Sequence, residues 1–264
     1  MVSPTERMIV ETEGAIGWMV FNNPARRNAI SRDMWEAIPL IIDHFERDPA
    51  VRVIVLKGAG DKAFISGADI SQFEEQRASR EAVESYEAIA ERAHARLQET
   101  AKPTIAMIHG FCIGGGVGIA LSCDLRLASA TARFGVPAAR LGLGYRWSGV
   151  KKLVDLVGPS YAKEIFYTAR HFNAEEAYAM GLVNRVLPDR ELDAYVRSYC
   201  AMITDNAPLT LQAVKGTVYE LGKAADGFDR KRCDDLVARC FASEDYIEGR
   251  RAFMEKRKPA FQGK

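Results

Sequence analysis

Short apolar runs mark the strands that we expect in the first half of the chain. Two of these runs flank Gly14 within residues 7–22, which predicts a pair of strands joined by a turn. Three further runs are short and end near turn residues, as is typical of buried strands, and they cover residues 51–58, 102–110 and 124–130.

Segments with helical periodicity separate these runs. Ser31 can cap a helix that runs to about residue 47, although Pro39 removes one hydrogen bond inside it and can kink it. Residues 79–100 are amphipathic at helical spacing. Strands that alternate with helices imply crossover connections, so the pattern predicts an α/β fold with a largely parallel sheet.

The second half of the chain has an almost entirely helical pattern. From Gly149 onward, we expect breaks only at residues 158–159, over the short apolar stretch 181–188, and at residues 207–208. The helical last third can form either a small separate domain or a face for oligomerisation.

Charge and cysteine content narrow the functional classes. The chain has 264 residues, with 36 Lys and Arg against 35 Asp and Glu, and this balance does not suggest a general nucleic-acid binder. Its five cysteines form no C-x-x-C pair, which fits a reducing compartment. We find no apolar signal core and no run near the ~18 apolar residues of a membrane span. We therefore expect a cytoplasmic protein without a nucleic-acid, membrane or metal partner.

Candidate chemistry is concentrated at two strand-to-helix junctions that are rich in small residues. They cover residues 58–70 and 109–120. Amides at the start of a helix have no acceptor within the helix, and small side chains allow a ligand to approach them. Two such junctions on neighbouring parallel strands would direct amides at one point, which suits a developing oxyanion. Glu74 and Glu75, just after the first junction, are interpreted as solvated helix residues.

The first junction also fits a dinucleotide-binding pattern, G-x-G-x-x-A, at Gly58, Gly60 and Ala63. That fingerprint needs a helix directly behind it and an acidic residue about 20 positions on, at the end of the next strand. Here a loop continues beyond Ala63 and the next strand ends at His109, so a dinucleotide-dependent oxidoreductase is the weakest alternative. We interpret His109 as a packed strand-end residue and not as a base.

Several segments resemble the crotonase (enoyl-CoA hydratase/isomerase) family in order and spacing. AFISGADI is similar to the F-x-A-G-A-D segment of that family, and IHGFCIGGG is similar to its second glycine loop. NPARRNAIS resembles its early CoA-contacting loop, and SEDYIEGRRAFMEKRKPAFQGK resembles its C-terminal tail. The resemblance runs nearly from end to end.

This resemblance implies a spiral of β-β-α turns with a C-terminal helical trimerisation region, in trimers that often pair into hexamers. We therefore expect a crotonase-like core with an oxyanion hole over residues 1–200 and a helical oligomerisation region over 201–264. No permanent cofactor is implied, because coenzyme A enters as part of the acyl-CoA substrate.

The resemblance also assigns site residues. The oxyanion amides carry over to Ala68 and Gly115. The resemblance implies that Ala68, Arg26 and Arg27 contact CoA. It also implies contacts from a neighbouring subunit, through Phe253 and Lys256.

Two departures from the family pattern affect the expected reaction. Hydratases of the family carry glutamates where this chain has Gly118 and Ala138. Hydration needs one group to deprotonate water and another to protonate the α-carbon, and each positioned group contributes ~10²–10⁴-fold. We therefore expect ordinary hydration to be weak or absent, and the usual isomerase base is missing too.

Tyr145 and Arg146 lie where the family places residues over the acyl group. They can belong to a subunit interface or a solvated turn, or they can act in the site, with Tyr145 donating a hydrogen bond and Arg146 pairing with a second carboxylate. The tail and the Gly144-Tyr145 pair are also similar to methylmalonyl-CoA decarboxylase. The alternatives to an enolate-forming lyase or isomerase are thus a decarboxylase of a malonyl-type CoA thioester and an acyl-CoA-binding homologue without catalysis.

Overall fold

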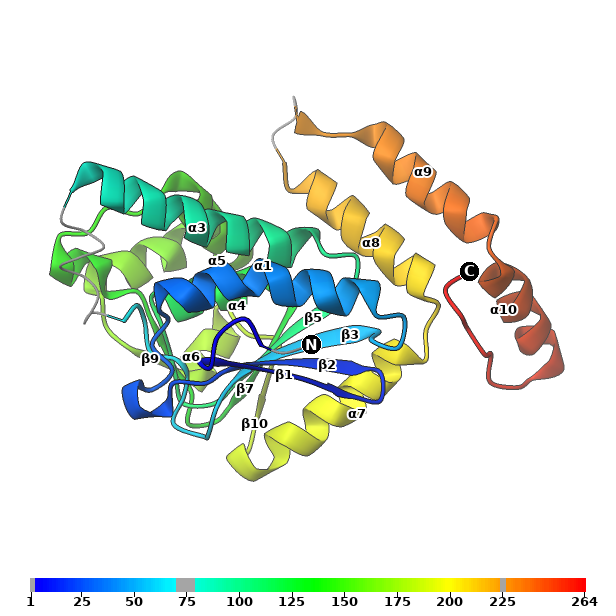
Figure 1. Cartoon of the computed structure of the whole chain (residues 1–264), viewed down its shortest axis with the longest axis horizontal. Helices are drawn as coiled ribbons and strands as arrows, with labels where there is room; N and C mark the ends of the chain where they lie inside the picture. Colours follow the sequence, from blue (N-terminus) through cyan, green and yellow to red (C-terminus); the bar gives the residue numbers. More distant parts are fainter. Residues whose placement is uncertain (1–2, 70–78, 224–226) are drawn as a thin grey trace.

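Two β-sheets form the framework of the protein, and the computed structural model describes residues 3–69, 79–223 and 227–264 (Figure 1). The larger sheet has the strand order β1-β2-β3-β5-β7-β10, and the smaller has the order β4-β6-β8-β9. In chain order, the strands of the larger sheet are Met8–Glu13, Ile16–Phe21, Val53–Gly58, Thr104–Ile108, Leu125–Ser129 and Arg185–Leu187. Those of the smaller sheet are Ala63–Ile65, Phe111–Ile113, Arg133–Gly135 and Phe172–Asn173. These pairings are parallel except for β1 with β2 and β8 with β9.

Helices connect the strands and cover the larger sheet. The described α-helices are α1 (Arg32–Arg47), α3 (Arg80–Glu99), α4 (Gly115–Ser122), α5 (Trp147–Thr168), α6 (Ala174–Ala179), α7 (Leu192–Thr204), α8 (Pro208–Leu221), α9 (Arg230–Phe241) and α10 (Glu244–Glu255). Short 3-10 helices span Pro24–Arg26 (η1), Pro137–Leu141 (η3) and Asp189–Glu191 (η4). Figure 1 shows α1 and α3 side by side on one side of the larger sheet, with α7 on the other.

The chain repeats a β-β-α turn that gives one strand to each sheet. The three turns are β3-β4-α3, β5-β6-α4 and β7-β8-α5. Glycine makes the corner between the two strands of a turn possible, because a Cβ on Gly58 would lie 2.1 Å from the carbonyl oxygen of Ala63, and one on Gly110 would lie 2.0 Å from that of Lys62. This repeat confirms the predicted α/β spiral.

Alternate residues of the central strands enter two separate apolar clusters. Ile54 and Leu56 of β3 belong to the cluster that contains the buried face of α1. Val53 and Val55 belong to a second cluster, which contains the buried side chains of α7. The period of two along a strand therefore fixes one helical layer on each face of the sheet.

Most of the predicted elements are confirmed. The strand pair around Gly14, the strands of the first half and the helices after Ser31 and Ser79 all form. The N-cap Ser31 makes no side-chain bond to a helix amide, and its hydroxyl instead donates to Oδ1 of Asp33 at 2.5 Å. Pro39 is buried within α1. Glu74 and Glu75 lie outside the described residues.

The prediction of an almost purely helical second half is wrong at β9, which has only two residues and therefore gives no alternation of apolar and polar positions. The expected break over residues 181–188 is confirmed, because it contains β10. The predicted breaks at residues 158–159 and 207–208 are confirmed, since Gly158 has a φ of 76° and α8 begins at Pro208. The expected boundary between residues 200 and 201 falls within α7, and the division into two domains stays a prediction.

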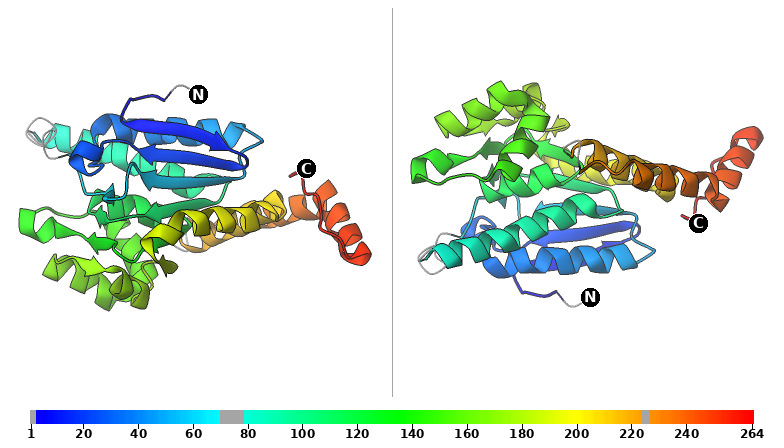
Figure 2. Two further views of the ribbon diagram at one scale, coloured as in Figure 1. Left: turned by 90° about the horizontal axis from the view of Figure 1, so that it is seen from below. Right: turned by 90° about the horizontal axis from the view of Figure 1, so that it is seen from above.

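The C-terminal arm, which we define as residues 208–264, projects from the body of the protein (Figure 2). At its base, Nζ of Lys215 bonds to Oδ2 of Asp124 at 2.8 Å, and Arg52 donates to the carbonyl oxygen of Phe261 at 3.1 Å. All five cysteines of the chain are free thiols. Among the described helices, none combines the length and apolarity needed to cross a membrane.

Candidate active site

The two small-residue junctions predicted from the sequence touch one another. They contain β4 and β6, which are paired in parallel. A Cβ on Gly114 would lie 3.9 Å from Cα of Gly67, and one on Gly67 would lie 3.8 Å from the carbonyl oxygen of Ile113. Both glycines have positive φ angles, 121° at Gly67 and 54° at Gly114, which L side chains rarely adopt. Glycine at both positions thus permits the junctions to meet.

Ala68 lies in the first junction, beside Ile30 in an isolated parallel bridge. The amide of Ile30 donates to the carbonyl oxygen of Gly67 at 2.8 Å, and the amide of Asp69 donates to that of Ile30 at 2.8 Å. Since successive backbone groups point in opposite directions, the amide of Ala68 points away from Ile30. Within the described residues, no hydrogen-bond acceptor is recorded for it.

Gly115 is the first residue of α4, with Gly114 as the N-cap. Its amide belongs to the first turn, where the amides have no acceptor within the helix. A Cβ on Gly115 would have ordinary contacts, 3.4 Å from Ile30 and 3.5 Å from Trp35. At Gly116, by contrast, a Cβ would lie 2.4 Å from the carbonyl oxygen of Ile65. Gly116 is therefore needed for packing, whereas the amide of Gly115 is available to a ligand.

A cavity of about 300 Å³ opens at these junctions, between α3, α4 and α5. Its lining contains both oxyanion candidates, both positions that lack the family glutamates, and both bulky residues of the later loop. These are Ala68, Gly115, Gly118, Ala138, Tyr145 and Arg146. The structure thus brings the six residues to one cavity, while their chemical roles stay predictions.

Tyr145 packs its ring into the wall of the cavity. The ring meets that of Phe166 edge to face, with centroids 5.0 Å apart. Burial raises the pKa of Tyr145 to about 12, because the phenolate would lose its hydration. The phenol is therefore neutral near pH 7 and can donate a hydrogen bond.

Arg146 already has a carboxylate partner at the edge of the cavity. Its Nε donates to Oε2 of Glu87 at 2.6 Å, and 56% of the Arg146 side chain is exposed. Exposed pairs of this kind contribute only ~0–1 kcal/mol, so a ligand can displace Glu87 at little cost. A substrate carboxylate could replace Glu87 or bind the N–H groups of the guanidinium that Glu87 does not use.

His94 of α3 is a cavity residue that the sequence analysis missed. A Cβ on Gly118 would lie 3.0 Å from Cε1 of His94 and 3.3 Å from Nε2, so the imidazole occupies the space beside this glycine. The ring packs edge to face against Trp35, with centroids 5.0 Å apart. The signal that could have found it is its spacing of four and eight residues from Ala90 and Tyr86, which also line the cavity.

Two further hydrogen bonds organise this wall. Nδ1 of His94 lies 3.0 Å from Oγ of Ser122, and Nζ of Lys152 donates to the same oxygen at 3.4 Å. Burial, together with the nearby charge of Lys152, lowers the pKa of His94 to about 3. Burial also lowers the pKa of Lys152, against an opposing effect of Glu91. The imidazole is therefore neutral at physiological pH.

The two arginines expected to contact CoA lie beside the Ala68 junction but not in the cavity wall. Nη1 of Arg26 bonds to Oδ1 of Asp69 at 2.6 Å, next to Ala68 in the chain. The guanidinium of Arg27 lies over the ring of Phe111, 5.1 Å from its centroid. His109 directly follows β5 and is absent from the cavity wall, as expected for a packed strand-end residue. Among the described residues, no cluster of His, Cys, Asp or Glu could hold a metal ion.

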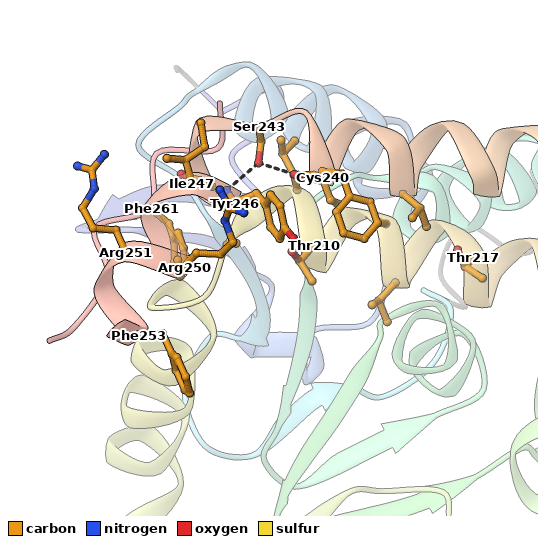
Figure 3. Close-up of a pocket in the computed structure, with 18 of the residues that line it drawn as sticks. Thr210, Thr217, Cys240, Ser243, Tyr246, Ile247, Arg250, Arg251, Phe253 and Phe261 are labelled. Atoms are coloured by element: carbon orange, nitrogen blue, oxygen red, sulfur yellow. Dashed lines mark hydrogen bonds between the residues drawn. The ribbon is translucent and has the colours of Figure 1, made fainter. Parts of the chain in front are cut away.

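Phe253 and Lys256 lie on the C-terminal arm, far from α3 and α5 of the same chain (Figure 1). The Phe253 side chain is 82% exposed, and it lines a second, apolar cavity of about 1230 Å³ within the arm (Figure 3). Any contact of these two residues with CoA in the α3–α5 cavity would therefore need another copy of the chain.

Comparison with known proteins places this geometry in a family. Residues 11–264 match the family model described as Enoyl-CoA hydratase/isomerase. The crotonyl-CoA hydratase of Syntrophomonas wolfei is 36% identical over 261 residues, which cover 98% of this chain and 99% of that protein. The short-chain-enoyl-CoA hydratase of Clostridium acetobutylicum is 34% identical, with 95% of each chain covered. A crystal structure of an enoyl-CoA hydratase/carnithine racemase from Magnetospirillum magneticum is similar with a TM-score of 0.94, at 33% identity, covering 98% of this chain and 97% of that one.

Proposed function

Because the chain belongs to the enoyl-CoA hydratase/isomerase family, we propose that it processes acyl-CoA thioesters by stabilising an enolate with the backbone amides of Ala68 and Gly115. One observation carries this proposal: two amides that find no acceptor within the described residues lie at touching junctions on one cavity. Removal of the α-proton, or of a group on the α-carbon, moves negative charge onto the thioester oxygen. Donors held in place for that charge contribute ~10²–10³-fold each, because they need no reorganisation during the reaction.

Ordinary hydration of an enoyl-CoA should be slow in this protein. The relatives are named as hydratases, but Gly118 and Ala138 carry no group that can move a proton, and the space beside Gly118 is taken by His94. Without a positioned acid and base, the oxyanion hole alone supplies only the electrostatic part of catalysis.

Two alternatives to an enolate-forming lyase or isomerase remain. Decarboxylation of a malonyl-type CoA thioester needs no base, since the departing carboxylate supplies the electrons, but the arginine available to bind that carboxylate is paired with Glu87. An acyl-CoA-binding homologue without catalysis is favoured by the absence of carboxylates at Gly118 and Ala138. Formation of an enolate separates an enzyme from a binding protein, whatever the final product.

The C-terminal arm supports a homotrimer, or a hexamer of two trimers, as the assembly. Its helices expose large apolar side chains, including Phe241 at 63% and Met254 at 80%, around the cavity in Figure 3. Apolar surface on a projecting arm is best covered by a second copy of the chain. Such a copy would also bring Phe253 and Lys256 to the CoA of its neighbour, to stack on the adenine and pair with the 3′-phosphate.

Exchange of the α-protons of a saturated acyl-CoA in heavy water tests the enolate directly, with nuclear magnetic resonance as the readout. We expect exchange with the wild type and a loss of ~10²–10³-fold in Gly115→Pro, which removes the amide proton at a helix position that favours proline. Gly115→Ala is the matched control, because it retains the amide and its Cβ has room. Binding of the thioester without any exchange would indicate the non-catalytic alternative, and equal rates in the two variants would exclude Gly115 as an oxyanion donor.

A further inference from the structure

The α3–α5 cavity follows one side of α4, away from the proposed oxyanion site. Gly115, Gly118 and Leu121 line it, and their spacing of three residues places them on the same side of the helix. The helix ends at Ser122, seven residues after Gly115, which is ~10.5 Å along a helix axis. An acyl chain that begins at Gly115 therefore extends toward the C-terminal end of α4.

Lys152 of α5 places an ammonium group at this far end of the cavity. The side chain lines the cavity, and its Nζ donates to Oγ of Ser122 at 3.4 Å. Within the described residues, Nζ forms no ion pair with a carboxylate, and this one bond leaves two of its three N–H groups for a ligand. Burial lowers the pKa of Lys152, but the carbonyl groups in the last turn of α4 favour a positive charge beside them.

Glu91 does not neutralise this ammonium group by direct contact. It is exposed, and its Oε2 accepts a hydrogen bond from Ser148 at 3.2 Å, one helical turn before Lys152 on α5. The other cation of the cavity wall, Arg146, is bonded to Glu87. Among the described residues of the wall, Lys152 is therefore the cation without a carboxylate partner.

The remaining polar side chains of the wall do not select for negative charge. They are hydroxyl groups and a neutral imidazole, which form hydrogen bonds with charged and uncharged ligands alike: Ser66, Tyr86, His94, Tyr145 and Ser148. A partly buried ammonium group, in contrast, attracts an anion because the surrounding protein screens the charge less than water does. Lys152 therefore favours an acyl chain that carries a negative group.

The length of α4 sets the length of the acyl chain that reaches Lys152. An extended chain advances ~1.2 Å per bond. In a glutaryl group, six bonds separate the thioester oxygen from a carboxylate oxygen, a span of ~7 Å, and the hydrogen bond to an ammonium group adds ~2.8 Å. The result is close to the ~10.5 Å that separates Gly115 from Ser122. A malonyl group is two carbons shorter, so its carboxylate ends ~2.5 Å before this point.

We propose that Lys152 binds a terminal carboxylate of the acyl chain, so that this protein selects dicarboxylic acyl-CoA thioesters of about five carbons, such as glutaryl-CoA. The inference rests on the proposed function, since it takes the thioester oxygen to be bound at Gly115. The two ends of α4 then hold the two ends of the acyl group. In this role, Lys152 is a specificity-determining residue and takes no part in proton transfer.

The test compares the affinities of glutaryl-CoA and its neutral terminal amide by titration calorimetry on the whole chain. We expect the wild type to bind the acid ~10–100-fold more tightly, as is typical of a charged hydrogen bond that is partly shielded from water. Lys152→Met retains the length of the side chain without its charge, and the preference should fall below about twofold. Lys152→Arg retains the charge, so part of the preference should return.

A series of chain lengths tests the inference on the wild type alone. The preference for the acid over its amide should be largest for glutaryl-CoA and fall below about twofold for malonyl-CoA. A preference that is largest for malonyl-CoA, or one that survives in Lys152→Met and disappears in Arg146→Gln, would place the carboxylate at the edge of the cavity and overturn the role of Lys152.

Two outcomes separate the inference from the proposed function. Equal affinities of the wild type for glutaryl-CoA and its amide would overturn the role of Lys152 while leaving an acyl-CoA site. If neither thioester binds the wild type, the proposed function fails and the inference fails with it.

Discussion

Replacement of Gly118 by glutamate tests how the cavity adapts to the loss of a family carboxylate. The new Cβ would lie 3.0 Å from Cε1 of His94, whereas carbon atoms in good contact are ~3.5–4.0 Å apart. The imidazole must therefore shift by a few tenths of an ångström, which disturbs its packing against Trp35 and its bond to Ser122. Overpacking of this kind costs ~1–3 kcal/mol, and in a chain of this size each kcal/mol lowers the Tm by roughly 2–4 °C.

His94→Ala provides the second half of a double-mutant cycle. It removes the ring that the glutamate would strike, so Gly118→Glu should be less destabilising in the His94→Ala background than in the wild type. For side chains in direct contact, we expect a coupling energy of ~0.5–3 kcal/mol, measured from urea unfolding of the four proteins. Additive effects within ~0.5 kcal/mol would refute the contact.

The His94→Ala background also leaves space for glutamates at the two positions where the family pattern has them. With His94→Ala present, Gly118→Glu and Ala138→Glu together should raise hydration of crotonyl-CoA by more than either change alone, since water and the α-carbon need separate proton-handling groups. Loss of the enoyl absorbance measures the rate. The reasoning is wrong if the wild type already hydrates crotonyl-CoA as fast as a family hydratase under matched conditions, because another residue would then supply the acid and the base.

Two further predictions concern pH and the arm. Burial and the nearby charge of Lys152 keep His94 unprotonated in the folded protein down to about pH 3, while the unfolded chain takes up a proton below about pH 6.5. The free energy of unfolding should therefore fall as the pH drops below 6.5, by up to ~1.4 kcal/mol per pH unit, and urea titrations of His94→Gln should lack this part of the decrease. Lys256→Ala should weaken CoA binding at low salt and much less at high salt, and an unchanged affinity at low salt would argue against its contact with the 3′-phosphate.

Much of the spiral could be predicted from local pattern, because a strand buried on both faces gives a short apolar run that ends at turn residues, and an amphipathic helix gives a period of 3.6. The limits of this reasoning show at the second sheet. Its strands, such as Ala63–Ile65 and Phe111–Ile113, are only three residues long and lie inside segments that read as glycine-rich loops. The corners at Gly58 and Gly110 are set by backbone from distant parts of the chain, which no local period records.

The sequence by itself determined the positions of the two amide-bearing junctions. Small residues between a buried strand and a helix leave the amides of the first helical turn open to an anion. The sequence also shows that two carboxylates of the family pattern are absent, because Gly118 and Ala138 have no group to ionise. Only the tertiary structure decided which side chain occupies the space beside Gly118. His94 comes from a different helix, and its neutral state depends on burial and on the nearby charge of Lys152. A pKa is set by neighbours in space, so the neighbours of this histidine along the chain could not reveal it.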